Sequence, residues 1–430
     1  MSSVTSQRKI LIENISSMLF LQGINYILPL VTLPYLTRTL GIEKFGLISF
    51  AIIFIQYFTT IVDYGFNLTA TRQISVYRDN PKKVSEIFSS VIVIKVFLLV
   101  LCFLLMNSII LSVDKFHDDL ILYHVCFIAV LGNVLFPIWF YQGLEHLKKI
   151  ALINAITKIS ITALIFIFVK QQHDYLVAAF LQCLAVVIAG VIAIIYVPFT
   201  YPVKIIIPKI QVIKQLLLEG FPVFISVISS NIFGNSNIFI LGILYSNKEV
   251  GYFTIAQKIV WAFCYLVPPI GNAIYPRMGL MFKESNERAI KALRKLLLYG
   301  SGAFIIISSA IYLFSGFFVK IATGRSENDI VILIKVMAIL PLCFFIDNVL
   351  GTQIMLNRGM DKKYMTTYII GGLVSVLLAI ILIPQFSHFG ASINQLISEV
   401  FIICLMYYFV QKEKINILSV NHFNVNFTVI

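Results

Sequence analysis

Charged residues are scarce in this sequence. Only 12% of its 430 residues are Asp, Glu, Lys or Arg, while 59% are hydrophobic, and the mean hydropathy is +0.92. A soluble domain carries roughly a quarter charged residues, so this composition cannot build a surface that faces water. Apolar runs follow one another almost from end to end, and we therefore expect the whole chain to be a membrane protein.

The sequence also lacks the short motifs of common active sites and cofactor sites. It contains no G-x-S-x-G, no P-loop, no H-E-x-x-H and no G-x-G-x-x-G. Its six Cys form no C-x-x-C pair, and no His-rich spacing indicates a metal site. We therefore expect neither an enzyme nor a bound cofactor or metal, and any work the chain does is not driven by ATP bound to it.

Acidic residues are outnumbered by basic ones, 20 to 33, which gives a formal net charge of +13. Such a balance can indicate nucleic-acid binding, but here most Lys and Arg lie in short connectors between apolar runs, as in membrane proteins with a fixed orientation. The two tails and the connectors on one side hold 22 of them, and the opposite connectors hold 7. We expect a multi-pass bacterial inner-membrane protein with both termini cytoplasmic, in contact with membrane lipids and not with nucleic acid.

Runs of about 20 apolar residues are long enough to span a bilayer, and they predict an all-α fold of about twelve transmembrane helices. The pair Pro268-Pro269 predicts a kink in one of them. The expected helices lie near residues 15–36, 45–66, 88–111, 120–140, 150–170, 175–197, 219–243, 251–274, 297–319, 329–350, 364–384 and 390–410.

The second half of the sequence echoes the first. Gly46 is matched by Gly251, and Ala51 by Ala256, both at an offset of 205 residues. We predict two six-helix bundles, residues 1–203 and 204–430, related by an axis along the membrane normal, because copies with an even number of helices keep the same orientation. Such parallel halves commonly enclose a cavity at the membrane midplane.

Two long basic connectors occupy equivalent places in the two halves. They are residues 71–89 and 276–296, and the second has the spacing of a short amphipathic helix. Such a helix would lie on the anionic surface of the membrane. A direct role in recruiting substrate is the competing interpretation.

Several stretches share an order and spacing that is typical of one transporter family. They are LPYLTRTLG (33–41), FGLISFA (45–51), DYGFNLTATR (63–72), EGFP (219–222), SSN (229–231), LG (241–242), VGYF (250–253), YPR (275–277), GASIN (390–394) and SE (398–399). Together they resemble the Wzx-type O-antigen and polysaccharide repeat-unit flippases, a branch of the multidrug/oligosaccharidyl-lipid/polysaccharide exporter superfamily. The resemblance spans nearly the whole chain.

The resemblance implies a V-shaped fold of two six-helix bundles that opens alternately to either side of the membrane. It implies that the chain moves undecaprenyl-diphosphate-linked oligosaccharide repeat units to the periplasmic leaflet, driven by a gradient of H⁺ or Na⁺ or of the substrate, and that a polysaccharide polymerase complex is a partner. Lipid II flippases differ, since they usually have two additional helices and basic residues in the first one. Here residues 16–36 contain no charge.

Lysines inside the expected helices are the candidate ligands for the diphosphate. An unpaired charge is costly in the hydrocarbon core, so cations facing an internal cavity would stabilise the anion there. The candidates are Lys95, Lys158 and Lys258. Snorkelling to the headgroups is the competing interpretation for each, and it is favoured for Lys335.

Two acidic residues are candidates for ion coupling, Asp347 and Asp63. Carboxylates in membranes usually pair with a cation or mark an ion pathway. For Asp63 a structural partnership with Arg72 or with the basic connector is the alternative, whereas Asp347 is the stronger coupling candidate.

Uncharged polar residues on the first and seventh helices are candidate ligands for sugar hydroxyls. These two helices are equivalent in the two halves, and both are expected to line the cavity. The candidates are Gln22, Asn25, Asn231 and Asn235. Packing between helices through small polar residues is the alternative.

Two other functions remain open. A cation-coupled multidrug exporter of the same superfamily would use a largely apolar cavity with a carboxylate. A membrane-embedded glycan polymerase or ligase would need a large periplasmic loop, and every outward connector here is short. The intramembrane lysines and the many Asn and Ser residues favour an anionic glycolipid as the substrate.

Overall fold

The computed structural model describes residues 2–413 and 415, and their side chains from residue 23 onward. All regular elements in this part of the chain are helices, which confirms the all-α prediction. Those of the first half are α1 (Ser2–Asp63), α2 (Phe66–Val76), α3 (Pro81–Ser112), η1 (Asp114–Asp119), α4 (Leu120–Leu135), α5 (Ile138–Gly143), α6 (Leu147–Phe168), η2 (Gln172–Asp174) and α7 (Tyr175–Thr200).

The second half begins after an irregular connection at residues 201–209. The predicted boundary at residues 203 and 204 lies within this connection. The elements that follow are α8 (Ile210–Leu244), α9 (Asn247–Cys264), α10 (Val267–Glu284), α11 (Asn286–Leu313), α12 (Ser315–Thr323), α13 (Asn328–Met337), α14 (Leu340–Asn348), the π-helical η3 (Val349–Leu356) and α15 (Asp361–Lys412).

Ten helical segments among the described residues are long and apolar enough to cross a membrane. Two of them contain a break, at Gly41 in α1 and at Ser387 in α15, so the ten provide the twelve crossings that the sequence predicts. Gly41 has φ 79° and ψ 165°, a conformation that is open to glycine because it has no Cβ. The break therefore separates two crossings where the sequence placed a short connector.

The helix expected at residues 251–274 is interrupted. Helix α9 ends at Cys264, and α10 begins at Val267 with Pro268 in its first turn. Proline is tolerated there because the amide hydrogens of a first turn have no helical acceptor. The kink predicted from the proline pair is thus a break between two helices.

The basic connector expected at residues 276–296 is helical on both sides of a single residue. Helix α10 continues to Glu284, and α11 begins at Asn286. The intervening Ser285 caps α11, since its Oγ accepts a hydrogen bond from the Arg288 amide at 3.4 Å. The prediction of a separate amphipathic helix was therefore wrong, because both flanking membrane helices extend into the basic segment.

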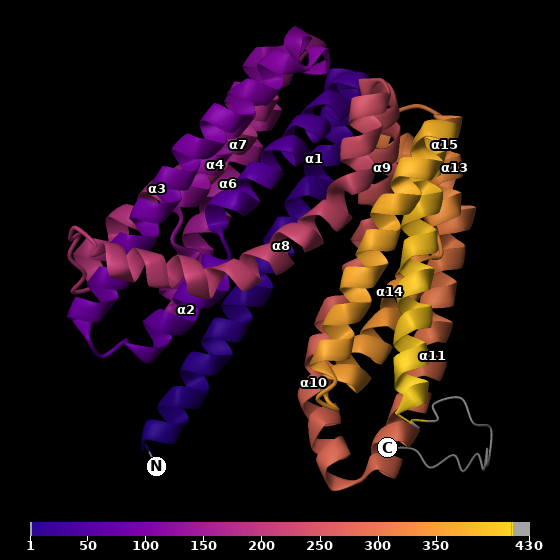
Figure 1. The fold of residues 1–430 in the computed structure, drawn as a ribbon. Helices are drawn as coiled ribbons and strands as arrows, with labels where there is room; N and C mark the ends of the chain where they lie inside the picture. Colours follow the sequence, from indigo (N-terminus) through magenta and orange to yellow (C-terminus); the bar gives the residue numbers. More distant parts are fainter. Residues whose placement is uncertain (1, 414, 416–430) are drawn as a thin grey trace.

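The helices form two lobes that meet at one end and diverge toward the end where α1 begins and α15 ends (Figure 1). Helices α1 to α7 form the N-terminal lobe, and α9 to α15 form the C-terminal lobe. Helix α8 crosses between them: Phe224 near its start stacks on Tyr64 of the N-terminal lobe at 4.9 Å, and Asn237 farther along accepts a hydrogen bond from Asn394 of α15 at 2.6 Å. This arrangement is the V shape that the resemblance implied.

The two repeats touch at matching positions where the lobes meet. A Cβ built on Gly46 of α1 would overlap the carbonyl oxygen of Asn247 and the backbone of Gly251. A Cβ on Gly251 of α9 would in turn overlap the carbonyl oxygen of Ile42. Glycine at these two positions, 205 residues apart in the sequence, lets the backbones of α1 and α9 come into contact.

Candidate functional site

A largely apolar cavity with a few polar side chains lies between the two lobes. It consists of two adjoining spaces of about 230 and 370 Å³ that share Asn25, Ser49 and Lys258 among their walls. Its walls come from α1, α6 and α7 of the N-terminal lobe, from α9 of the C-terminal lobe and from α8. We call it the lysine cavity, because Lys158 and Lys258 line it.

The two lysines of this cavity carry no partner charge. Lys158 Nζ donates a hydrogen bond to Asn25 Oδ1 at 2.5 Å, and Lys258 Nζ lies 5.0 Å from the centroid of the Phe45 ring. Among the described residues no carboxylate lines the cavity. Two ammonium groups without a counter-ion in an apolar protein interior form a site that attracts an anion.

Two of the predicted asparagines lie with these lysines. Asn25 of α1 contributes to both parts of the cavity, and Asn235 of α8 lines the larger part. Asn231 lies elsewhere on α8, where its Nδ2 donates to the Val227 carbonyl of the same helix at 3.2 Å. Gln22 is in α1, but its side chain falls outside the described residues.

Lys95 lies in a different environment from the other two lysines. Its Nζ donates to Asp63 Oδ1 at 2.8 Å and to the Asn133 carbonyl at 3.4 Å, and its side chain is 1% exposed. These contacts join α1, α3 and α4 inside the N-terminal lobe. The structure thus pairs a predicted substrate ligand with a predicted coupling acid, and neither residue lines the lysine cavity.

Asp347 lies in the C-terminal lobe, on α14. Its Oδ2 accepts a hydrogen bond from the Tyr368 hydroxyl at 2.8 Å, and its Oδ1 is buried without a hydrogen-bond partner. No cation pairs with it within the described part of the chain. Unlike Asp63, which is paired with Lys95, this carboxylate has no cation and has one buried oxygen left for a further ligand.

A second cavity of about 600 Å³ adjoins the first. It lies between α8, α9, α14 and α15, and it shares Gly234 and Trp261 with the larger part of the lysine cavity. We call it the serine cavity after the hydroxyl groups that line it. They belong to Ser226, Ser229, Ser230, Ser375 and Ser398.

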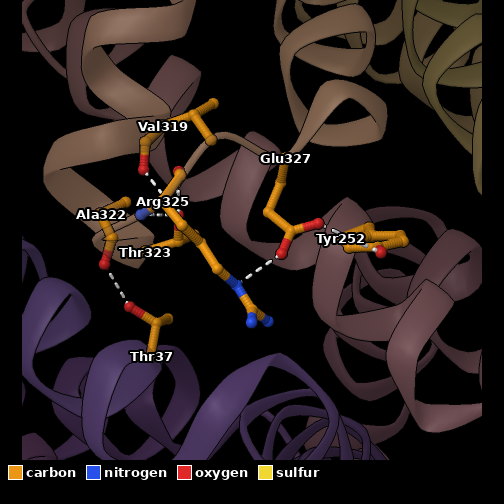
Figure 2. Close-up of polar contacts among 7 residues, drawn as sticks. All are labelled: Thr37, Tyr252, Val319, Ala322, Thr323, Arg325 and Glu327. Carbon is orange, nitrogen blue, oxygen red and sulfur yellow. Dashed lines mark hydrogen bonds and ion pairs between the residues drawn. The ribbon is translucent and has the colours of Figure 1, made fainter.

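The lobes are held together on the side of the cavity away from the start of α1 and the end of α15. Thr37 Oγ1 of α1 donates a hydrogen bond to the Ala322 carbonyl of α12, as Figure 2 shows beside the Arg325–Glu327 ion pair and Tyr252. Arg38 donates to the Ile321 carbonyl. The N-terminal lobe thus supplies donors to the carbonyl end of α12, where a helix favours them.

Several lining residues were missed in the sequence. The polar residues Ser49, Gln182, Thr254 and Gln257 line the lysine cavity, and each could be recognised in the sequence as a polar residue inside an apolar run. Trp261 carried a further signal, since the chain has only two Trp. None of these signals says which face of a helix meets the other lobe.

The chain is similar in sequence to a polysaccharide biosynthesis family and to proteins assigned as O-antigen transporters. The family model described as polysaccharide biosynthesis protein matches residues 11–282. The chain is 34% identical over 407 residues to a protein assigned as an O-antigen transporter in Escherichia coli (strain K12), covering 94% of this chain and 97% of the relative. It is 28% identical over 396 residues to one with the same assignment in Shigella dysenteriae, covering 92% and 98%.

Solved structures with similar folds belong to transporters as well. One is an inward-facing multidrug resistance transporter of the MATE family and MOP superfamily, with a TM-score of 0.69 and 17% identity, covering 91% of this chain and 96% of the other. Another is the lipid II flippase MurJ in an inward closed conformation, with a TM-score of 0.70 and 15% identity, covering 92% and 87%. At these identities the likeness shows the fold, which confirms the V-shaped exporter fold.

Proposed function

The chain belongs to the polysaccharide biosynthesis protein family, and from that premise we propose that it is a flippase. Its substrate is an undecaprenyl-diphosphate-linked oligosaccharide, the repeat unit of O-antigen or a related surface polysaccharide. It carries the unit from the cytoplasmic to the periplasmic leaflet of the bacterial inner membrane. The relatives assigned as O-antigen transporters cover 94% and 92% of the chain, so the proposal concerns the whole protein.

One observation carries the proposal: the lysine cavity holds two lysines and, in the described part of the chain, no carboxylate. A diphosphate needs positive charge to cross about 30 Å of hydrocarbon, where its water is lost. Lys158 and Lys258 would bind it, while Asn25 and Asn235 would donate to nearby oxygens. A cation-coupled drug exporter gains nothing from such a cavity, because two ammonium groups repel a cationic drug.

The transport cycle follows from how the lobes meet. The lobes diverge on the side of the start of α1, the end of α15 and the basic connectors, which the distribution of Lys and Arg assigns to the cytoplasm. The repeat unit would enter from that side. Separation of Thr37 from α12 and of Gly46 from Gly251 would then release it on the other.

Return of the empty carrier needs a gradient, and Asp347 is the coupling residue that we propose. Its unpartnered Oδ1 leaves a site for H⁺ or Na⁺. Asp63 is a weaker candidate because its carboxylate is already paired with the ammonium group of Lys95. A polysaccharide polymerase complex would receive the product at the periplasmic surface.

Deletion of the gene in its native strain tests the proposal. We expect loss of the surface polysaccharide on gels and accumulation of complete repeat units on undecaprenyl diphosphate by mass spectrometry. The plasmid-borne gene should restore both. A normal polysaccharide together with new sensitivity to cationic drugs would overturn the proposal and favour the multidrug exporter.

A further inference from the structure

The serine cavity has walls of a different chemistry from the lysine cavity. Serines line it from two helices, with Ser226, Ser229 and Ser230 on α8 and Ser375 and Ser398 on α15. The hydroxyls of Ser229 and Ser398 donate to the Ile225 carbonyl and to Asn394 Oδ1, and their oxygens remain acceptors. Its volume of about 600 Å³ lies within the ~300–1,000 Å³ that is usual for ligand sites. Hydroxyls donate and accept with little geometric constraint, so they suit ligands that carry many hydroxyls themselves.

Aromatic rings add flat surfaces to the same cavity. Trp261, Tyr364 and Tyr368 line it, and Trp261 Nε1 is buried without a hydrogen-bond partner. Because this N–H is itself buried, Trp261 presents its ring and not its donor to the cavity. Aromatic faces beside free polar groups match a sugar ring, which presents C–H groups on its faces and hydroxyls at its edge.

The cavity also contains a carboxylate, Glu399 of α15, which interacts electrostatically with the neighbouring carboxyl group of Asp347 on α14. Glu399 on α15 lines the cavity and is only 9% exposed, and no hydrogen bond or ion pair joins it to another described residue. A carboxylate accepts short, strong hydrogen bonds from hydroxyl groups. Two neighbouring hydroxyls of one sugar would satisfy its two oxygens.

A glycine and a tryptophan stand at the junction between the two cavities. Gly234 on α8 and Trp261 on α9 line both of them. A Cβ built on Gly234 would meet no heavy atom within 4 Å. The backbone here needs no glycine for packing, and the missing side chain leaves space at the boundary that the two cavities share.

We propose that the serine cavity is the glycan subsite and that Gly234 and Trp261 form its entrance. The inference rests on the proposed function and deepens it: the diphosphate binds in the lysine cavity, and the hydroxyl-rich sugars extend past Gly234 against Trp261, Glu399 and the serines. The width of the entrance then limits which repeat units the protein moves. A lipid with a single sugar would stay beside the lysines.

Filling the entrance tests this assignment. Wild-type protein and Gly234→Trp are reconstituted in proteoliposomes with two lipids, the repeat unit isolated from the native strain and undecaprenyl diphosphate bearing one sugar. The readout is the ratio of their initial transport rates. We expect Gly234→Trp to lower the ratio at least tenfold, with transport of the one-sugar lipid kept. Gly234→Ala should leave the ratio unchanged, because its methyl group has room.

A matched variant controls for the added bulk. Gly302 on α11 also has no heavy atom within 4 Å of a built Cβ and lines neither cavity, so Gly302→Trp should transport both lipids like the wild type. An unchanged ratio in Gly234→Trp would overturn the glycan subsite, and so would equal loss of both lipids in a folded Gly234→Trp protein. If the wild-type protein moves neither lipid, the proposed function itself fails, which is a different result.

Discussion

Lys95 and Lys258 each lie inside an apolar helix, Lys95 in the interior of the N-terminal lobe and Lys258 in the lysine cavity. They differ in whether the protein supplies a partner for the positive charge. Lys95 is an ion-pair partner of Asp63 at 2.8 Å. Lys258 has the ring of Phe45 beside it at 5.0 Å and no carboxylate partner among the described residues. The first lysine is already neutralised by the protein, whereas the second is left for a ligand.

This difference separates a structural charge from a functional one. An ion pair inside a membrane protein satisfies both groups and fixes the helices that carry them. An unpaired ammonium group destabilises the folded protein, and such groups are found where they bind a substrate or an ion. Removal of Lys95 should therefore lower the protein level more than it lowers transport. Removal of Lys258 should lower transport and leave the protein level unchanged.

The largest effect is expected from the cavity lysines. Hydrogen bonds to charged groups contribute about 1.5–3 kcal/mol, so Lys258→Ala or Lys158→Ala should lower export roughly 10- to 100-fold. The membrane level of either variant should match the wild type, because neither lysine has a charged partner that its removal would leave unpaired. Surface polysaccharide on gels and quantified protein in membrane fractions provide the two measurements.

A third lysine offers a control for the loss of charge alone. Lys335 on α13 is exposed and lies 5.3 Å from the centroid of the Tyr312 ring, away from both cavities. Lys335→Ala should export polysaccharide at the wild-type level. Full polysaccharide in both the Lys158 and the Lys258 variants would defeat the idea that these cations bind the substrate.

A smaller effect on export and a larger one on stability are expected at the paired lysine. Lys95→Ala leaves Asp63 without its cation, and breaking a buried pair in this way costs roughly 3–5 kcal/mol. We expect a low membrane level and a reduced thermal midpoint. The double variant Lys95→Met, Asp63→Leu should recover the level and export polysaccharide, because neither charge meets the ligand.

The outcome of the double variant decides between two roles. A stable double variant that no longer exports would show that the pair takes part in transport. In that case the contrast between Lys95 and Lys258 would fail, and the ion pair would have to open during the cycle.

Much of the fold could be predicted because membrane helices are encoded locally. Apolar runs of the right length give each crossing without knowledge of its neighbours, and a glycine such as Gly41 ends one crossing before the next. The extension of α10 and α11 into the basic segment around Ser285 was missed. The amphipathic spacing predicted a helix there, but the drop in hydropathy hid that this helix is continuous with the membrane helices on both sides of Ser285.

The site was harder to predict, since it depends on which face of each helix meets the other lobe. Lys95, Lys158 and Lys258 are alike in sequence: each is a single cation in an apolar run. Only the structure places Asp63 next to Lys95 and Asn25 next to Lys158. The serine cavity could not be located at all, because α8 and α15 are far apart in the chain.

The smallest expected effect extends the comparison from lysines to carboxylates. Asp63 has a cation. Asp347 instead has the Tyr368 hydroxyl, one buried oxygen without a hydrogen-bond partner, and the carboxyl group of Glu399 as an electrostatic neighbour. If Asp347 takes up the coupling ion, Asp347→Asn should keep its contact with Tyr368 and its protein level, yet alter the dependence of transport on pH or on sodium in vesicles. Asp63→Asn combined with Lys95→Met is the matched control, which removes both charges of the closed pair and should leave both dependences as in the wild type. If Asp347→Asn leaves the pH and sodium dependence of transport unchanged, Asp347 is not the coupling residue. A buried oxygen without a partner would then not be sufficient evidence for an ion site, because strained polar groups in a protein core share that feature.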